Sequence, residues 1–461
     1  MKPKIWLLTA MTVAVLADAC YGAAPKVISM TLHQAEAKSL AYSNSLKSSK
    51  ADWLATQYQA QSQYANLLPR LTLDGSYRYV GVVPSLNVIP GESFALGAYN
   101  NYSVGPTLTY TLWDGGANRD MYHSLQSLSE SRKADHRLAA QQILMNARMA
   151  YVKVQLALEE LHLIAGTLKV SQAQYSDISK KFLAGSASRL DRLSSHRETL
   201  SYLLQFKQRQ TDLASGLEDL VALTGDQDNM SPADAGAPCD EEVLSEGATG
   251  IPHPTLLVYF DPLMESFKNM VNMPTQEPGP DHPQLQSDEF QAQASALSAE
   301  SAKSQLWPVL QLSARTSLDY PNGPILEQIN QNIVGVTLSM PLWEWDRTRS
   351  TVGQHRSEAV AAQFHLAQSQ LDLRRDWRKG VEQIKALQEQ LDVSSQAVVE
   401  AQEHAKLSYQ TYRYGRISLL DVQNSNLLSL QAQVQRARIV AQILIQKVQL
   451  LSLSGKEFAD E

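Results

Sequence analysis

The sequence is poor in cysteine, in clustered positive charge and in long apolar runs. Only two of its 461 residues are cysteines, so a disulfide framework cannot hold the fold together. The formal net charge is −7, and an acidic chain without a basic patch offers no electrostatic attraction for nucleic acid. After residue 25, no stretch approaches the roughly 20 apolar residues that a membrane-spanning helix needs. These absences argue against a disulfide-rich scaffold, a nucleic-acid-binding protein and a bundle of membrane-spanning helices.

Recognisable catalytic motifs are absent as well. The chain has no His-Glu-x-x-His, no Gly-x-Ser-x-Gly, no P-loop and no Gly-x-Gly-x-x-Gly motif, which are signatures of several large enzyme classes. Its ten histidines are scattered, so no metal site is visible. Cys239 stands beside Asp240 and Glu241, whose charges disfavour the thiolate that a nucleophile needs. We therefore expect no enzyme, no cofactor and no metal.

The N-terminus carries the pattern of a secretory signal peptide. Lys2 and Lys4 precede an apolar stretch from Ile5 to Ala17, which has the length of a signal core and is too short to cross a bilayer. Small residues follow and offer cleavage sites, so we assign residues 1–23 to the signal. Cys20 directly follows the first of these sites, which makes it a candidate for lipid attachment as well. Either reading predicts export from the cytoplasm.

One long internal repeat organises the rest of the chain. The segment 105–114 resembles 335–344, and the same offset of 230 residues relates three further matches along the chain. Pro69 and Pro308 match at an offset of 239, so the first copy has about nine extra residues between its two alternating stretches. We assign 26–225 to the first repeat and 282–455 to the second. Residues 226–281 form a proline-rich linker between them, and 456–461 form a C-terminal tail.

Each repeat predicts a very long helix that is followed by a returning helix. The stretch from Gly116 to Phe182 contains no proline, and at 1.5 Å per residue it would reach on the order of 100 Å. A helix of this length indicates a coiled coil. Apolar or small residues recur every seven positions on the returning helix of the second repeat, namely Leu420, Leu427, Val434, Ala441 and Val448. From the helices alone, a soluble coiled-coil rod would fit.

Four alternating stretches argue for a different environment. They run over about 71–79, 103–112, 310–319 and 334–342, and period-two alternation places one set of side chains on each face of a sheet. Strands of this length can cross a bilayer at a tilt. The polar faces include charged residues that would be costly in lipid but suit a water-filled lumen, namely Asp74, Arg78, Arg315 and Asp319. Since four strands cannot close a barrel, several chains would have to share one.

With this order of motifs, the sequence resembles the TolC family of outer-membrane efflux and secretion channels. The residues that carry the resemblance are Leu67–Pro69, Leu112–Gly116, the turns from Gly185 to Asp191 and from Gly415 to Val422, and two terminal Leu-x-Gly sequences. The resemblance implies a mainly α fold with a small β part, in which a homotrimer forms one 12-stranded barrel in outer-membrane lipid. The long helices would continue it as a helical barrel in the periplasm. A periplasmic adaptor and an inner-membrane pump would complete the system.

The resemblance also implies positions for functional residues. A constriction at the helical tips would involve Asp421 and Asn424 of the second repeat, with Asp191 as the equivalent of Asp421 in the first. The family often carries a second carboxylate where this chain has Asn424, so a weaker ring of charge is expected. Gly185 and Gly415 would shape the adaptor-docking tips, where Ser186, Arg189 and Arg416 would make contacts. Asp191 and Asp421 also fit the simpler role of carboxylates at a helix N-terminus.

Two functions remain at this point. The first is a passive exit duct of a tripartite efflux or type I secretion system, which lies in the outer membrane and extends into the periplasm. The alternative is a structural periplasmic coiled-coil or adaptor protein without a pore. Adaptors typically carry one helical hairpin between compact β domains, whereas this chain predicts two hairpins with strands at the opposite end.

Overall fold

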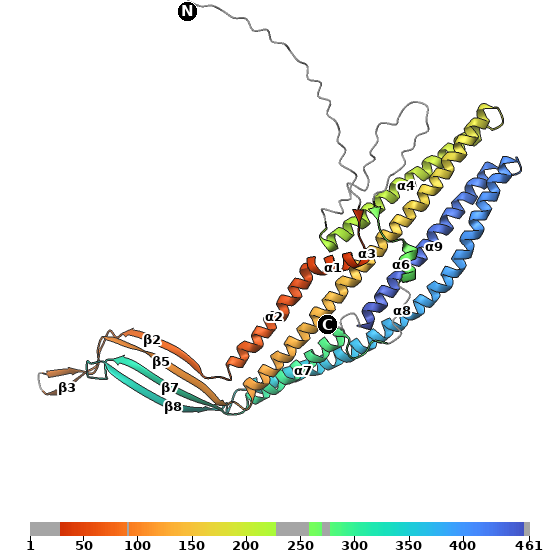
Figure 1. The fold of residues 1–461 in the computed structure, drawn as a ribbon. Helices are drawn as coiled ribbons and strands as arrows, with labels where there is room; N and C mark the ends of the chain where they lie inside the picture. Colours follow the sequence, from red (N-terminus) through yellow and green to blue (C-terminus); the bar gives the residue numbers. More distant parts are fainter. Residues whose placement is uncertain (1–27, 90–91, 227–257, 270–276, 456–461) are drawn as a thin grey trace, which may run out of the picture.

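The computed structural model describes residues 28–89, 92–226, 258–269 and 277–455. The signal peptide assigned to residues 1–23, the candidate lipidation site Cys20, the tail 456–461 and most of the linker lie outside these residues. The described chain is elongated, with a layer of helices at one end and a narrow sheet at the other (Figure 1).

The two repeats fold into matching sets of elements. Helices α3 (Ala117–Leu183) and α8 (Arg347–Arg413) each have 67 residues and differ by 230 positions. Helices α4 (Arg189–Thr224) and α9 (Leu419–Ser454) each have 36 residues at the same offset. Helices α2 (Asn44–Ala65) and α7 (Pro283–Ser304) each have 22 residues and differ by 239 positions. The duplication read from the sequence is therefore a duplication of structure.

A short helix, α1 (Leu32–Tyr42), precedes α2 and packs near α3 and α4. Within each repeat, the long helix turns at its tip and pairs with the returning helix (Figure 1). Helix α3 lies in the middle of the layer because α2, α4, α7 and α9 all pack against it. Helix α8 lies at an edge of the layer, where it packs mainly against α7 and α9. Consequently 21 residues of α3 are buried, but only nine of α8.

The seven-residue pattern predicted for α9 marks buried positions in the part of the helix far from the tip, but not near the tip. Ala441 and Val448 are buried, whereas Leu420 is 60% and Leu427 is 40% exposed. Near the tip, the buried positions are instead Leu419, Val422 and Asn426. The buried positions are displaced there because α9 packs against α3 of the other hairpin as well as against α8, so a pattern for two helices does not describe it.

The four long strands form one antiparallel sheet in the order β2-β5-β7-β8. They are β2 (Arg70–Tyr79), β5 (Asn100–Trp113), β7 (Val309–Tyr320) and β8 (Ile329–Ser339). Strands β3 (Ser85–Ile89) and β4 (Glu92–Ala95) form a separate hairpin between β2 and β5 at the end far from the helices (Figure 1). The extra residues of the first repeat therefore lie at that end, as the offsets indicated.

The strand expected over 334–342 begins earlier and pairs only as far as Ser339. Pro341 follows, and a proline cannot donate the backbone hydrogen bond that continued pairing needs. Met340 to Trp345 therefore form a connection to α8, in which Leu342, Trp343 and Trp345 are exposed.

The described part of the linker packs against the middle of the helical layer. Strand β6 (Val258–Tyr259) pairs in parallel with β1 (Ile28–Ser29), and α6 (Leu263–Asn269) lies against α9 and α3. The hydroxyl of Tyr151 on α3 shares its single proton between the Asp261 carboxylate at 3.0 Å and the Met30 carbonyl at 3.1 Å. The N-terminal strand and the linker are thus tied to the same point of α3.

Candidate channel sites

Both long helices end in the same tight turn. Gly185 and Gly415 each have a φ of +74°, the left-handed conformation that glycine adopts without the penalty of a Cβ atom. The amide of Ser186 donates to the Lys181 carbonyl at 2.8 Å, and that of Arg416 donates to the Thr411 carbonyl at 3.2 Å. These are the closing hydrogen bonds of a Schellman motif. Gly185, Ser186, Arg189, Gly415 and Arg416 are all exposed on the turns.

Asp191 and Asp421 cap the helices that follow. The Asp421 carboxylate accepts hydrogen bonds from the Ser418 amide at 3.1 Å and the Ser418 hydroxyl at 2.7 Å, and the Asp421 amide donates to the Ser418 hydroxyl. Asp191 makes the same reciprocal set with Ser188. The bonds from Ser418 hold the pKa of the Asp421 carboxyl below its ordinary value, because they favour the ionised form.

The structure places Asp421 and Asn424 on one tip, where both are exposed. Asp191 occupies the equivalent position on the other hairpin. One chain does not enclose an opening at these residues, so a constriction there would need further copies of the chain. The simpler capping role of the two aspartates is realised in the single chain.

A contact between the two hairpins near their tips escaped the sequence analysis. Ile178 on α3 is buried against Leu419 and Val422 on α9. Beside them, the Tyr409 hydroxyl on α8 donates to the Asp177 carboxylate on α3 at 3.0 Å. The partners are 232 residues apart, and no local pattern marks either one. Burial, together with the Asp177 carboxylate, raises the pKa of Tyr409 to about 12, so this hydroxyl remains a donor at neutral pH.

Polar side chains continue the contact away from the tips. The Asn426 amide on α9 donates to Gln174 on α3 at 3.0 Å. Next to it, within the first hairpin, Ser171 on α3 bonds Thr199 on α4 at 2.9 Å. Glu198 on α4 lies in the same layer, and burial raises the pKa of its carboxyl. The interface between the hairpins is therefore polar at this level, in contrast to the apolar core farther along α3.

A carboxylate joins three helices in the middle of the layer. Glu160 on α3 has a side chain that is only 7% exposed. It forms an ion pair with Arg209 on α4 at 2.9 Å and accepts a hydrogen bond from Arg438 on α9 at 2.7 Å. Since a buried carboxylate needs compensating charge, this arrangement fixes the second hairpin against the first.

At the other end of the molecule, the sheet separates polar from apolar side chains. The register pairs Asp74 with Gly105, Ser103 with Asp319 and Thr107 with Arg315, so these residues share one face. The Arg315 guanidinium donates to the Ser103 hydroxyl at 2.6 Å, and that hydroxyl donates to Asp319 at 2.5 Å. Arg78 belongs to the same face of β2 as Asp74. All four charged residues predicted for a lumen thus lie on one face, and two of them are linked through Ser103.

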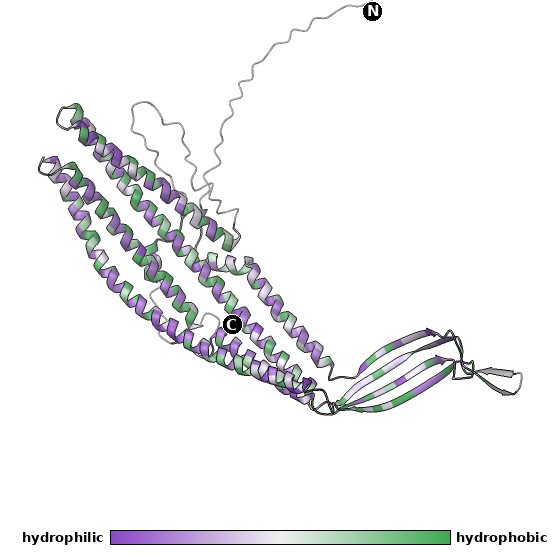
Figure 2. Cartoon of the chain, turned by 180° about the vertical axis from the view of Figure 1, so that it is seen from behind, coloured by the Kyte–Doolittle hydropathy of each residue, from purple (hydrophilic) through white to green (hydrophobic). Residues whose placement is uncertain are grey.

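The opposite face of the sheet is apolar and uncovered. Its most exposed residues, between 60% and 76% accessible, are Leu71, Leu73, Tyr77, Tyr79, Val334, Val336 and Leu338. The alternation is visible along the strands in Figure 2. So much exposed apolar surface on one face indicates a partner or a lipid environment.

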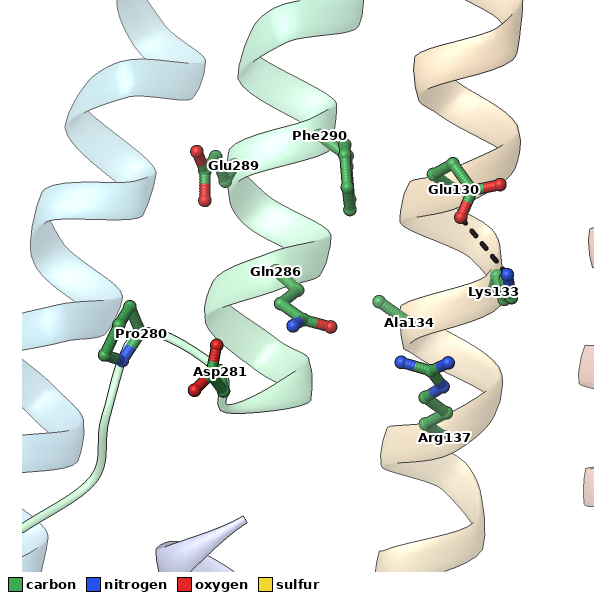
Figure 3. A pocket seen from close by; sticks show the side chains of 9 residues that line it. All are labelled: Glu130, Lys133, Ala134, Arg137, Pro280, Asp281, Gln286, Glu289 and Phe290. Carbon is green, nitrogen blue, oxygen red and sulfur yellow. Dashed lines mark hydrogen bonds and ion pairs between the residues drawn. The ribbon is translucent and has the colours of Figure 1, made fainter. Parts of the chain in front are cut away.

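One pocket lies between α3 and the start of α7 (Figure 3). It has a volume of about 350 Å³. Glu130, Lys133 and Ala134 line it from α3, while Gln286 and Phe290 line it from α7. Residues of both charges line this pocket, and none of them is a predicted site residue. The pocket therefore gives no indication of a substrate.

No group of three or more metal-ligating side chains was found among the described residues. None of the helices in that part of the chain is both long and apolar enough to cross a membrane.

Solved structures with the same fold come from outer-membrane channels. CusC aligns with a TM-score of 0.74 at 15% identity, over 95% of this chain and 96% of CusC. The CmeC outer membrane channel of Campylobacter jejuni aligns with a TM-score of 0.74 at 17% identity, over 92% and 85% of the two chains. The open-state MtrE outer membrane channel of Neisseria gonorrhoeae gives 0.69 at 15% identity, over 92% and 88%.

Comparison with curated protein sequences finds no significant match. The family model for outer membrane efflux proteins matches residues 37–226 and 280–456, which is well over half of the chain and includes both repeats. The chain therefore belongs to the outer membrane efflux protein family.

Proposed function

We propose that three copies of this chain form one passive channel, the exit duct of a tripartite efflux or secretion system. The observation that carries the proposal is a sheet with an exposed apolar face, a charged opposite face and two unpaired edges, β2 and β8. Unpaired edges are not viable in lipid. Pairing β8 of one chain with β2 of the next would close a barrel of 12 strands from three chains.

The internal repeat supplies the geometry for such an assembly. Inside the chain, α7 of the second repeat packs on α3 of the first, and β7 pairs with β5. Applying the same relation once more would bring α2 of the next chain onto α8 and β2 onto β8. The open edge of the helical layer and the open edge of the sheet lie on the same side of the chain, so one placement covers both.

In this assembly, the polar face of the sheet would line the lumen with Asp74, Arg78, Arg315 and Asp319. The tips would converge at the periplasmic end, where Asp421, Asn424 and Asp191 would surround a constriction. Asn424 supplies no charge, so the ring would carry fewer carboxylates than one with acids at both positions. The duct would carry out no catalysis, and the direction of transport would be set elsewhere.

The exposed turns would meet a periplasmic adaptor, which in turn would couple the duct to an inner-membrane pump. Gly185, Ser186, Arg189, Gly415 and Arg416 are the surface residues of these turns. Their accessibility and their identical backbone geometry in both repeats support a repeated docking motif.

Purification from an outer-membrane fraction tests the proposal. We expect a detergent-dependent trimer by native mass spectrometry, and discrete conductance steps after reconstitution into a planar bilayer. A water-soluble monomer without conductance would instead support a structural periplasmic coiled-coil protein.

A further inference from the structure

The connection between sheet and long helix has the same backbone shape in both repeats but different residues. In the first repeat, Gly115 and Gly116 have φ values of +67° and +91°. At the equivalent positions of the second repeat, Trp345 and Asp346 have φ values of +50° and +60°. The left-handed conformation is strained for a non-glycine residue because its Cβ atom crowds the backbone. A tryptophan therefore stands where the repeat itself shows that glycine would fit without strain.

Among the described residues, Trp345 makes no contact that would compensate for this strain, apart from an edge-to-face contact with Trp343. Its side chain is 85% exposed, and that of Trp343 is 75% exposed. The two rings contact only edge to face, with centroids 5.5 Å apart. Strained residues persist where their side chains have a role, and a large exposed aromatic side chain indicates a contact outside the chain.

The first repeat shows what lies next to this position. A Cβ atom on Gly115 would be 3.0 Å from Cβ of Trp307 and 3.3 Å from the carbonyl oxygen of Ser304. Trp113 meets Trp307 edge to face, with ring centroids 6.4 Å apart. Residue 115 thus lies directly against the C-terminal end of α7, and only glycine fits beside the large indole of Trp307.

The offset of 239 residues between α2 and α7 identifies the residues that would make the equivalent contact between chains. Ser304 and Trp307 correspond to Ala65 and Leu68 at the end of α2. Both replacements are smaller, and Leu68 is 49% exposed in the single chain. Inside the chain, the small residue of the contact is on the connection (Gly115) and the large one follows α7 (Trp307). Between chains, the large residue would be on the connection (Trp345) and the smaller one would follow α2 (Leu68).

We infer that Trp345 is an anchor between subunits, which packs on Leu68 of the partner subunit at the junction of barrel and helices. This inference rests on the trimer of the proposed function and adds the residues that join its subunits. The occupant is a second copy of this chain because the internal repeat displays the corresponding contact.

Disulfide trapping tests the inference. In the internal copy, a Cβ atom placed on Gly115 would lie 3.0 Å from Cβ of Trp307, which is shorter than the roughly 3.8 Å of a disulfide, so a small shift would bring the two positions into bonding geometry. A chain carrying both Leu68→Cys and Trp345→Cys should therefore form covalent dimers and trimers on a non-reducing gel. We expect about tenfold more of them than in either single variant, because only the pair brings two thiols within bonding range. The single variants keep the native cysteines and so report the background.

A second pair provides the matched control. Leu68→Cys with Leu190→Cys joins the barrel junction to a helical tip, and both positions are exposed. This pair should not cross-link. If the chain is trimeric by native mass spectrometry but the first pair forms no covalent species, the anchor is wrong and the trimer stands. A monomer would overturn both.

Trp345→Gly gives an independent readout. Glycine relieves the backbone strain, so the monomer should fold at least as well as the natural chain by circular dichroism. The SDS-resistant trimer should nevertheless dissociate at a lower temperature, because the indole no longer fills the space above Leu68 of the partner subunit. An unchanged dissociation temperature would contradict the inference and would fit a side chain that faces only lipid.

Discussion

At the scale of single residues, the hydrogen bond from Tyr409 to Asp177 is the sharpest link between the two tips. A hydrogen bond to a charged group contributes about 1.5 kcal/mol, which corresponds to roughly a tenfold change in an equilibrium constant. We expect Tyr409→Phe to raise the open probability of the reconstituted channel by about this factor. Single-channel recording in a planar bilayer measures it.

Tyr412→Phe is the matched control for this substitution. Tyr412 lies one turn closer to the tip and packs beside the same cluster, and no hydrogen bond of its hydroxyl is found among the described residues. Its removal should leave the open probability unchanged. Equal effects of the two substitutions would mean that packing, and not the bond to Asp177, holds the tips together.

Glu198 should make the stability of the fold depend on pH. Burial raises the pKa of its carboxyl in the folded state, so the folded state binds the proton more tightly than the unfolded chain. Stability should therefore fall as the pH rises from the ordinary glutamate value through the raised folded value. Glu198→Gln removes this loss. The variant should match the natural chain at pH 4 and exceed it at pH 7 in hydrogen-exchange protection of α4. Equal protection at both pH values would count against the buried position.

At the scale of elements, the ion cluster of Glu160 holds three helices together. With Arg209→Met and Arg438→Met combined, the carboxylate stays buried without a cation, which costs about 3 kcal/mol. Adding Glu160→Gln should restore most of that loss, since the uncompensated charge disappears. Denaturant unfolding in detergent measures all three variants. If the third substitution does not rescue the second hairpin, the arginines act through their packing instead.

The elements also show what the sequence can and cannot predict. The matching helices of 67 and 36 residues follow from the offset of 230, because a repeat in sequence that preserves helix breakers such as Gly185 and Gly415 preserves lengths. The placement of Arg315 and Asp319 on one face of the sheet follows from strict alternation. The exposure of Leu420 and Leu427 does not, because it depends on α3 packing beside α9. The same holds for Tyr409, whose partner Asp177 lies in the other repeat.

At the scale of the whole molecule, α3 of the first repeat is covered by α7, whereas the equivalent face of α8 is open in the single chain. Comparing the two helices predicts which surface residues of α8 become buried on assembly. Phe364 on α8 is 73% exposed, while its counterpart Ala134 on α3 is only 3% exposed. Ala134 faces a pocket that Phe290 of α7 also lines (Figure 3). The residue that corresponds to Phe290 in the first repeat is Ala51, so large and small side chains are exchanged here as they are at Trp345. Phe364 should pack on Ala51 of the partner subunit.

Phe364→Lys would place a charge in that contact, and we expect a folded chain that fails to form the trimer in native mass spectrometry. Val399→Lys is the control. Val399 is 64% exposed on the same helix, but its counterpart is Lys169, which stays exposed even on the covered helix α3. The control should therefore form trimers normally, although it adds the same charge to the same helix. Loss of the trimer in both variants would mean that net charge on α8, and not the relation between the repeats, governs assembly.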